Sequence, residues 1–288
     1  MAGNRSQYRR YTRSTAGNIF YFTVLILAGI FMVFPLFYCI ITSLKPLDEL
    51  LIFPPSFFVR RPTLSNYRVL PALLSNLQIP ISRYLFNSIF IAVVTTAVGI
   101  IASSLAAFTF SKSRIRGRKL MFTIVQLMLL YNAYTLGVPQ YLIFCKLHMI
   151  DTYWVYILPA IPSSVGCFLM KQFMDVSIPD SLLEAASIDG AGVMRIYWQI
   201  AMPIMKPAWM TVLLFSFQGM WSVVPSGTIF SEQLKTLPYV MSSVSAGGIA
   251  RSGSSMAITV LLMIPPIIVF LFTQSNVMET MSNSGIKE

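Results

Sequence analysis

Six long stretches of the sequence contain no Asp, Glu, Lys or Arg, and this pattern constrains the fold more than any other feature. A helix that spans the hydrocarbon core of a bilayer needs roughly 20 mainly apolar residues, and an ionised side chain near the bilayer centre is costly. The charge-free stretches are residues 14–44, 84–111, 120–145, 152–170, 207–231 and 252–278. The sequence therefore predicts an all-α integral membrane protein with six transmembrane helices.

The composition agrees with residence in a membrane. Of the 288 residues, 56 % are hydrophobic and 11 % are charged, whereas about 25 % of residues are charged in an ordinary soluble domain. The first span is too long for the apolar region of a signal peptide and lacks an Ala-x-Ala site after it, so we expect it to be retained. We expect one membrane domain, residues 1–288, with spans at 18–44, 84–111, 120–145, 152–172, 204–228 and 254–276.

The basic residues predict the orientation of the chain. Lys and Arg gather in the short loops and flanks on the cytoplasmic side of membrane proteins. With a cytoplasmic N-terminus, the inner segments hold 13 of the 21 basic residues, and the densest cluster, SKSRIRGRK, forms a short turn between the second and third spans. We therefore expect both termini in the cytoplasm. The net charge of +11 then indicates contact with membrane lipid and not with nucleic acid.

Prolines are expected to distort two of the spans. In the third, the stretch LGVPQ places Gly137 and Pro139 where they should end or kink the helix near its outer end. In the fourth, Pro159 and Pro162 interrupt the helical hydrogen bonds, so tertiary contacts must satisfy the freed backbone groups. The long outer loop, residues 45–83, contains FPPSF and RRPTLSNY, whose prolines favour extended and turn structure.

Residues 175–203, after the fourth span, form the one substantial loop on the predicted inner side. Its first part, IPDSLLEAASI, is typical of a helix start, because Asp180 and Ser181 are good capping residues and Glu184 suits the positive end of the helix dipole. Gly190 tolerates a positive φ and is expected to end that helix, and AGVMRIYWQIAM follows as a second helix. The sequence predicts a helix, a tight turn and a second helix between the fourth and fifth spans.

At this loop the sequence resembles the permease subunits of ATP-binding-cassette (ABC) importers. The family pattern is E-A-A, three residues, G, nine residues and then I-x-L-P, and this chain has EAASIDGAG followed by IAMP. Two positions depart from the pattern: Met202 replaces Leu, and Leu183 stands where a second Glu is frequent. The resemblance extends along the chain in SLKPLDEL, FPPSF, Asn66-Tyr67, Asn87-Ser88, LHMIDTYW and KTLPYV. These stretches look like the carbohydrate-uptake branch, specifically the second maltose-permease-type subunit.

The resemblance implies a role for the loop. In that family the two-helix loop of each permease seats in a cleft of a cytoplasmic ATPase, so that closure of the ATPase pair moves the permease helices. The implied coupling residues are Glu184, Ala185, Ala186, Asp189, Gly190, Ala191, Ile200 and Pro203. The small residues let two backbones approach closely, and the carboxylates can accept charge-assisted hydrogen bonds. Trp198 and Ile200 are expected to anchor the second helix.

The resemblance also implies the partners and the location of the chain. The partners are a second homologous permease subunit, two ABC ATPase subunits, an extracytoplasmic solute-binding lipoprotein and an oligosaccharide or related sugar. The chain would be a multi-pass protein of the bacterial cell membrane.

The sequence itself argues against an enzyme. It contains no Gly-Lys pair for a phosphate-binding loop and no H-E-x-x-H or G-x-S-x-G arrangement. Its three cysteines lack C-x-x-C spacing, and His148 beside Asp151 is expected at a surface or helix end. We therefore expect no cofactor or metal on this chain, with ATP and magnesium bound to the partner ATPase.

Polar and aromatic side chains inside the predicted spans are the candidates for a solute pathway. Neutral polar groups are costly to leave unpaired among helices and often face the interior. The candidates are Tyr131, Asn132, Ser163, Ser164, Gln218 and Trp221. Helix packing is the alternative role of each, and Ser222 after Trp221 departs from the family's tryptophan-asparagine pair, which weakens the inference there.

Other functions are also compatible with the sequence. An importer of another polar solute, such as glycerol phosphate or a peptide, would have the same loop, because the loop indicates that ATP drives transport and not which solute is transported. A membrane scaffold without transport activity is a further alternative, which purification without an ATPase would favour. A secondary transporter is disfavoured, since no predicted span holds a central carboxylate or Lys to couple ions.

Overall fold

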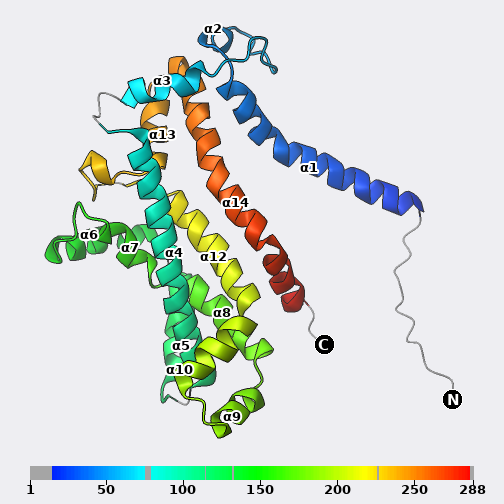
Figure 1. Cartoon of the computed structure of the whole chain (residues 1–288), viewed down its shortest axis with the longest axis vertical. Coiled ribbons are helices and arrows are strands. Elements are labelled where there is room, and N and C mark those ends of the chain that lie inside the picture. Colours follow the sequence, from blue (N-terminus) through cyan, green and yellow to red (C-terminus); the bar gives the residue numbers. More distant parts are fainter. Residues whose placement is uncertain (1–14, 75–78, 114, 132, 226, 286–288) are drawn as a thin grey trace.

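The structure is a computed structural model that describes residues 15–74, 79–113, 115–131, 133–225 and 227–285. Within these ranges all regular elements are helices (Figure 1). The long helices are α1 (Thr15–Ser43), α4 (Ile81–Lys112), α8 (Ser164–Ser177), α12 (Lys206–Trp221) and α14 (Ser252–Gly285). The shorter ones are α2 (Leu47–Leu50), α3 (Ser65–Leu74), α5 (Arg118–Leu129), α6 (Gly137–Lys146), α7 (Trp154–Ala160), α9 (Asp180–Ile188), α10 (Val193–Ile196), α11 (Met202–Ile204) and α13 (Leu237–Ser245).

Four helical segments are long and apolar enough to cross a membrane. They are Ala16–Ser43, Ile81–Lys112, Trp154–Ser177 and Ile249–Val277. A fifth is obtained if Val193–Ile204 and Lys206–Trp221, which meet at a bend of 78°, count as one broken span. The described part of the chain thus offers four or five candidate spans, where the sequence predicted six.

The predicted third span does not form one helix. Residues 120–145 are divided between α5 and α6, with a short 3₁₀ turn at Ala133–Leu136 before α6 begins. Pro139 lies in the first turn of α6, where its missing N–H would have no intrahelical acceptor. Gly137 and Pro139 therefore mark a break, but they begin a helix and do not end or kink one.

The fourth predicted span is distorted at its prolines, as expected. α7 ends at Ala160 and α8 begins at Ser164, so the helix is interrupted just after Pro159. The Ser163 hydroxyl accepts a hydrogen bond from the Gly166 N–H (3.0 Å). This side chain caps α8 and satisfies one of the backbone donors that the interruption frees.

α4 and α12 lie at the centre of the bundle. α12 contacts α4, α8 and α14, and α4 also contacts α5, α7 and α8. Ile100 of α4, Met170 of α8 and Val212 of α12 belong to one buried apolar cluster. α1 contacts α14, but its residues 16–37 are exposed, and it extends to one side of the bundle (Figure 1).

Side chains pin the loops at the end of the bundle that carries α2 and α3, hereafter the α2–α3 end (Figure 1). The Asn66 amide donates a hydrogen bond to the Ser43 carbonyl at the end of α1 (2.8 Å). The buried Glu49 carboxylate accepts the backbone N–H groups of Arg60 and Arg61 (3.0 and 2.9 Å). These contacts fold the long loop after α1 back onto that helix.

Asn87 of α4 also holds separate segments together at this end, and we call Asn66 and Asn87 the clamps of the α2–α3 end. Its side chain is fully buried, and its amide donates to the carbonyls of Gln233 and Lys235 (both 2.8 Å). Its carbonyl oxygen accepts a hydrogen bond from the Tyr153 hydroxyl (2.8 Å). One side chain thus joins α4, the residues before α7 and the segment between α12 and α13.

Candidate functional site

The two-helix loop lies at the opposite end of the bundle, hereafter the α9 end (Figure 1). α9 is its first helix, and the second runs from Val193 through a π-helical turn at Tyr197–Ala201 and α11 to Ile204. Residues 175–203 therefore have the helix-turn-helix form expected from the sequence. Met205 separates the second helix from α12, which leaves at the 78° bend.

Gly190 forms the turn between the two helices. Its φ is +82°, in the left-handed region that favours glycine. The Ala191 N–H donates to the Ala186 carbonyl and the Asp189 N–H to the Ala185 carbonyl, both at 3.0 Å. These bonds satisfy carbonyls that the end of α9 would otherwise leave unpaired.

Most of the residues assigned to coupling are accessible. Glu184, Ala185, Asp189, Gly190 and Pro203 are exposed, and Ala186, Ala191 and Ile200 are half-buried. The loop thus presents two carboxylates among side chains of little bulk. Such a surface can receive a close partner that carries donors or positive charge.

The carboxylate of Asp180 does not have the capping role that the sequence predicted. The N-cap of α9 is Pro179, which has no side-chain acceptor. Asp180 Oδ1 instead accepts a hydrogen bond from Nζ of Lys112, the last residue of α4 (2.7 Å). This ammonium group lowers the pKa of the Asp180 carboxyl. Lys112 also donates to the Ile178 carbonyl (2.6 Å), and its side chain is only 7 % exposed.

The second helix is anchored by a residue that the sequence analysis did not single out. Trp198 is 51 % exposed and Ile200 is half-buried, whereas Tyr197 is fully buried. The Tyr197 hydroxyl lies 2.5 Å from Ser104 Oγ of α4, and its ring meets the Phe108 ring edge-on (5.6 Å between centroids). The π turn changes which side chains face the bundle, so α-helical periodicity did not identify Tyr197.

The residues proposed for a solute pathway do not gather in one place. Gln218 and Trp221 line a cavity of about 410 Å³ between α1, α12, α13 and α14. Ser164 lines a different cavity, of about 300 Å³, between α4, α5 and α8. Tyr131 is exposed after the end of α5, and Asn132 lies outside the described residues.

Trp221 is mainly a packing residue. Its indole N–H donates to the Leu262 carbonyl of α14 (2.9 Å), and its ring stacks with that of Phe217 (5.9 Å between centroids). Only 4 % of the residue is exposed. Gln218, which is exposed, is therefore the better-placed polar group in this cavity.

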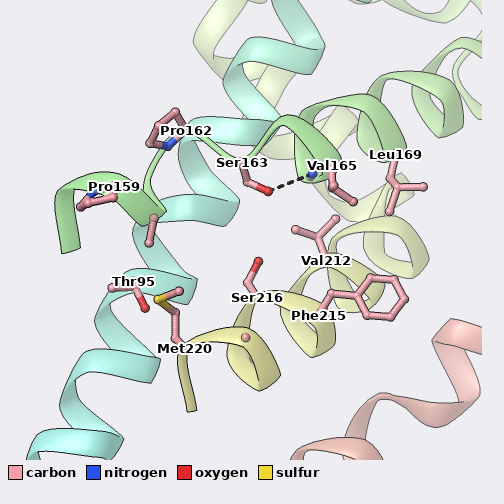
Figure 2. Close-up of a pocket in the computed structure, with 13 residues that line it drawn as sticks. Thr95, Pro159, Pro162, Ser163, Val165, Leu169, Val212, Phe215, Ser216 and Met220 are labelled. Atoms are coloured by element: carbon pink, nitrogen blue, oxygen red, sulfur yellow. Dashed lines mark hydrogen bonds between the residues drawn. The ribbon is translucent and has the colours of Figure 1, made fainter. Parts of the chain in front are cut away.

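A further cavity, of about 350 Å³, lies between α4, α8 and α12 (Figure 2). Its lining is largely apolar and includes Val212 and Phe215, while Thr95, Ser163 and Ser216 add hydroxyl groups. Figure 2 shows Ser163, the N-cap of α8, and Ser216 of α12 pointing toward the same space. A single hydroxyl residue in an apolar helix has no distinctive pattern, so sequence reasoning missed Thr95 and Ser216.

Asp151 has a structural role and does not pair with His148. Its Oδ1 accepts the backbone N–H groups of Phe230 and Ser231 (3.0 and 2.8 Å), and its Oδ2 accepts the Ser231 hydroxyl. The hydrogen bonds from Ser231 lower the pKa of the Asp151 carboxyl. Asp151 therefore holds the segment that follows α12. In the part of the chain that is described, no group of three His, Cys, Asp or Glu residues could hold a metal ion.

The chain is similar to permease proteins of bacterial sugar transport systems. It is 28 % identical over 258 residues to the arabinooligosaccharides transport system permease protein AraQ of Bacillus subtilis, covering 88 % of this chain and 90 % of that protein. It is 30 % identical over 284 residues to the galactooligosaccharides transport system permease protein GanQ of the same organism, covering 97 % of each. This chain belongs to the permease subunits of carbohydrate ABC importers.

Two further comparisons extend this assignment. The permease is 29 % identical over 266 residues to the sn-glycerol-3-phosphate transport system permease protein UgpE of Yersinia enterocolitica, covering 89 % of the permease and 93 % of that protein. No family model matches it. Its fold matches a solved bacterial ABC transporter involved in the import of the acidic polysaccharide alginate, with a TM-score of 0.76 and 24 % identity over 91 % of the permease and 98 % of that chain.

These findings make the permease a multi-pass membrane protein with an all-helical fold. Its relatives are transport permease subunits, which are not catalytic. Two of the stretches that carried the resemblance have structural roles, since Asn66 and Asn87 are the two clamps of the α2–α3 end.

Proposed function

We propose that the permease moves an oligosaccharide or a related sugar into the cytoplasm, as one subunit of an ATP-driven importer. Similarity over 97 % of the chain to a galactooligosaccharide permease is the observation that carries this proposal. A solute-binding protein outside the membrane delivers the sugar, and a second, homologous permease completes the pathway.

The two-helix loop, residues 175–203, is the proposed contact with a separate ATPase subunit that binds ATP and magnesium. The accessible carboxylates of Glu184 and Asp189, and the tight turn at Gly190, support this role. Small neighbours keep the turn open to a partner, since a Cβ atom added at Gly190 would meet nothing within 4 Å. The coupling residues named from the sequence therefore remain the proposed ATPase contact.

We place the α9 end in the cytoplasm and the α2–α3 end outside. In support, the start of α1 and the end of α14 both point away from the α2–α3 end, which favours two cytoplasmic termini (Figure 1). α5 begins near the α9 end and carries the basic residues Arg118 and Lys119. We assign α12 without the loop as the fifth crossing, and α5 and α6 together as a broken third crossing, which gives six in total.

The proposed solute pathway includes the cavity that Gln218 and Trp221 line. The primary amide of Gln218 suits sugar hydroxyls, whereas Trp221 packs in the wall of the cavity. The cavity in Figure 2 adds the hydroxyl groups of Thr95 and Ser216. Tyr131, Asn132 and Ser164 are proposed as further contacts along the path.

Affinity purification of the permease from its native membrane tests the proposal. We expect an ABC ATPase and a second permease to co-purify, and we expect a sugar to stimulate ATP hydrolysis in the presence of the solute-binding protein. The probes are galactooligosaccharides, arabinooligosaccharides and sn-glycerol 3-phosphate. Absence of any ATPase would overturn the proposal and favour a membrane scaffold.

Import of a non-sugar polar solute is the second candidate function. The similarity to a sn-glycerol-3-phosphate permease favours it specifically. Stimulation by sn-glycerol 3-phosphate alone, without a response to either oligosaccharide, would select this candidate.

A further inference from the structure

We infer that α4 is the helix that receives the motion of the two-helix loop, through two buried contacts made by Lys112 and by the Tyr197–Ser104 pair. The inference rests on the proposed coupling function of the loop. It adds three positioning residues, Ser104, Lys112 and Tyr197, which lie inside the permease behind the proposed coupling surface.

Lys112 ties the end of α4 to the start of α9. Its Nζ donates to the Ile178 carbonyl (2.6 Å) and to Asp180 Oδ1 (2.7 Å), and the side chain is nearly inaccessible. A buried ammonium group is costly unless it is paired and hydrogen-bonded, so these partners hold it firmly. Although Lys112 belongs to the basic cluster, it faces the loop and not the lipid headgroups.

Tyr197 ties the second helix of the loop to the same helix. Ser104 Oγ donates to the Ile101 carbonyl (3.0 Å), so the contact at 2.5 Å is a hydrogen bond that the Tyr197 hydroxyl donates. Both residues are fully buried. Loss of Ser104 would leave a buried tyrosine hydroxyl without this acceptor, which is unfavourable in a dry interior.

The two contacts together prevent the loop from rotating against α4. Ser104 and Lys112 are eight residues apart, which is about 12 Å along a helix. A single contact would act as a hinge, whereas two separated contacts fix both position and direction. Apolar packing supports them, because Ala201 of the loop and Met205, just after the second helix, share a buried cluster with Ala107 of α4.

α12 is less suited to receive the motion directly, although it follows the loop in the chain. The bend of 78° interrupts the helix between Ile204 and Lys206. A continuous helix transmits a displacement along its axis, but a break of this size does not. α4 has 32 residues without a break and reaches from the α9 end to the clamp at Asn87.

The test is a distance measurement inside the permease, in the complex purified with its ATPase. Spin labels are placed on Ser181→Cys of α9 and Val93→Cys of α4, both exposed positions, after alanine replaces the native cysteines. The distance is recorded with and without MgATP and vanadate. With both anchors intact, we expect the same distance in both states, because α9 and α4 move as one body.

The anchors are then removed by combining Lys112→Met with Ser104→Ala. We expect the distance distribution to broaden and shift on addition of MgATP and vanadate. Lys119→Met is the matched control, since Lys119 is an exposed member of the same basic cluster, and it should behave like the unmodified complex. Tyr197→Phe should broaden the distribution less than the double variant, because the contacts of Lys112 remain.

Two outcomes would overturn the inference: an unchanged distance in the double variant, or a nucleotide-dependent distance when both anchors are intact. The melting temperature is measured in parallel, because a purely structural role would lower it without changing the response to nucleotide. Failure of the proposed function is separate, since it appears as absence of a co-purified ATPase before any label is introduced.

Discussion

Single polar side chains with several partners hold both ends of the permease. Asn87 uses both amide hydrogens and its carbonyl oxygen in hydrogen bonds to three other residues. Lys112 joins a carbonyl and a carboxylate in a similar way. The sequence marks such residues as unusual in an apolar chain, but their partners lie 66 to 148 positions away. The type of residue was therefore predictable and its contacts were not.

Replacement of Gly190 by Val should disrupt the turn of the coupling loop. A side chain in the left-handed region costs about 1–2 kcal/mol, so the turn will relax and displace the coupling surface. We expect normal membrane insertion but loss of ATPase co-purification or of substrate-stimulated ATP hydrolysis. Gly192→Val is the matched control, because Gly192 has an extended backbone with φ of −68° and similarly open surroundings. Uptake and stimulated hydrolysis at normal levels in Gly190→Val would contradict this role.

Asp151 should make stability depend on pH. Its folded-state pKa is lowered, so its contribution to stability is present above the unfolded pKa of about 3.9 and is lost as pH falls through the lowered value. Asp151→Ala should therefore reduce stability at pH 7 by about 1 kcal/mol, with the difference shrinking as pH falls below about 4. Thermal unfolding between pH 7 and pH 3 measures it. Asp48→Ala, which removes a surface ion pair with Arg61, should have a smaller effect, and equal effects would argue against our account.

At the scale of helices, apolar length and proline positions predicted much of the fold. α1, α4 and α14 lie where long charge-free stretches were found, and the Pro159 region interrupts the fourth stretch as expected. Two elements could not be predicted. The break before α6 depends on where Pro139 falls within a new first turn, and the face of the second loop helix depends on a π turn. Both depend on tertiary contacts that periodicity does not record.

Close packing of α8 against α4 and α12 should depend on Gly166. A Cβ atom there would lie 2.9 Å from the hydroxyls of Ser103 and Ser163 and 3.1 Å from Val212 Cγ1. Gly166→Val should therefore destabilise the permease by about 1–3 kcal/mol through overpacking, seen as a lower melting temperature in detergent. Gly219→Val is the comparison, because Gly219 has open space around it. A larger loss of stability at Gly219 would refute this packing argument.

At the scale of the whole molecule, charge asymmetry and chain topology both support the proposed orientation. The two-helix loop and the clamped loops lie at opposite ends of the bundle (Figure 1). The sequence predicted this separation from the six charge-free stretches and the placement of basic residues between them. It did not predict that α1 would extend to one side with most of its length exposed. A uniformly apolar helix has the same sequence pattern whether it contacts lipid, another subunit or its own bundle.

Cysteine labelling of intact cells tests this orientation. Ser65→Cys, at the exposed start of α3, should react with a membrane-impermeant maleimide from outside. Ser181→Cys, at the exposed start of α9, should react only after permeabilisation. Both substitutions are made after alanine replaces the native cysteines, and the parent without any cysteine is the blank. The reverse labelling pattern would show that the permease has the opposite orientation.

The clamps at the α2–α3 end have a consequence for the kinetics of amide hydrogen exchange. Segments that buried side chains cross-link can open only when several hydrogen bonds break together, whereas α9 has no buried residue and is tied to α4 at its first residue, Asp180, so that its later residues can fray. Exchange should therefore be graded along the permease, with Lys235 and Leu237 among the slowest amides outside the long helices and α9 among the fastest. Binding of the ATPase would slow exchange in α9 first, and the contact surface would become visible as a loss of deuterium uptake.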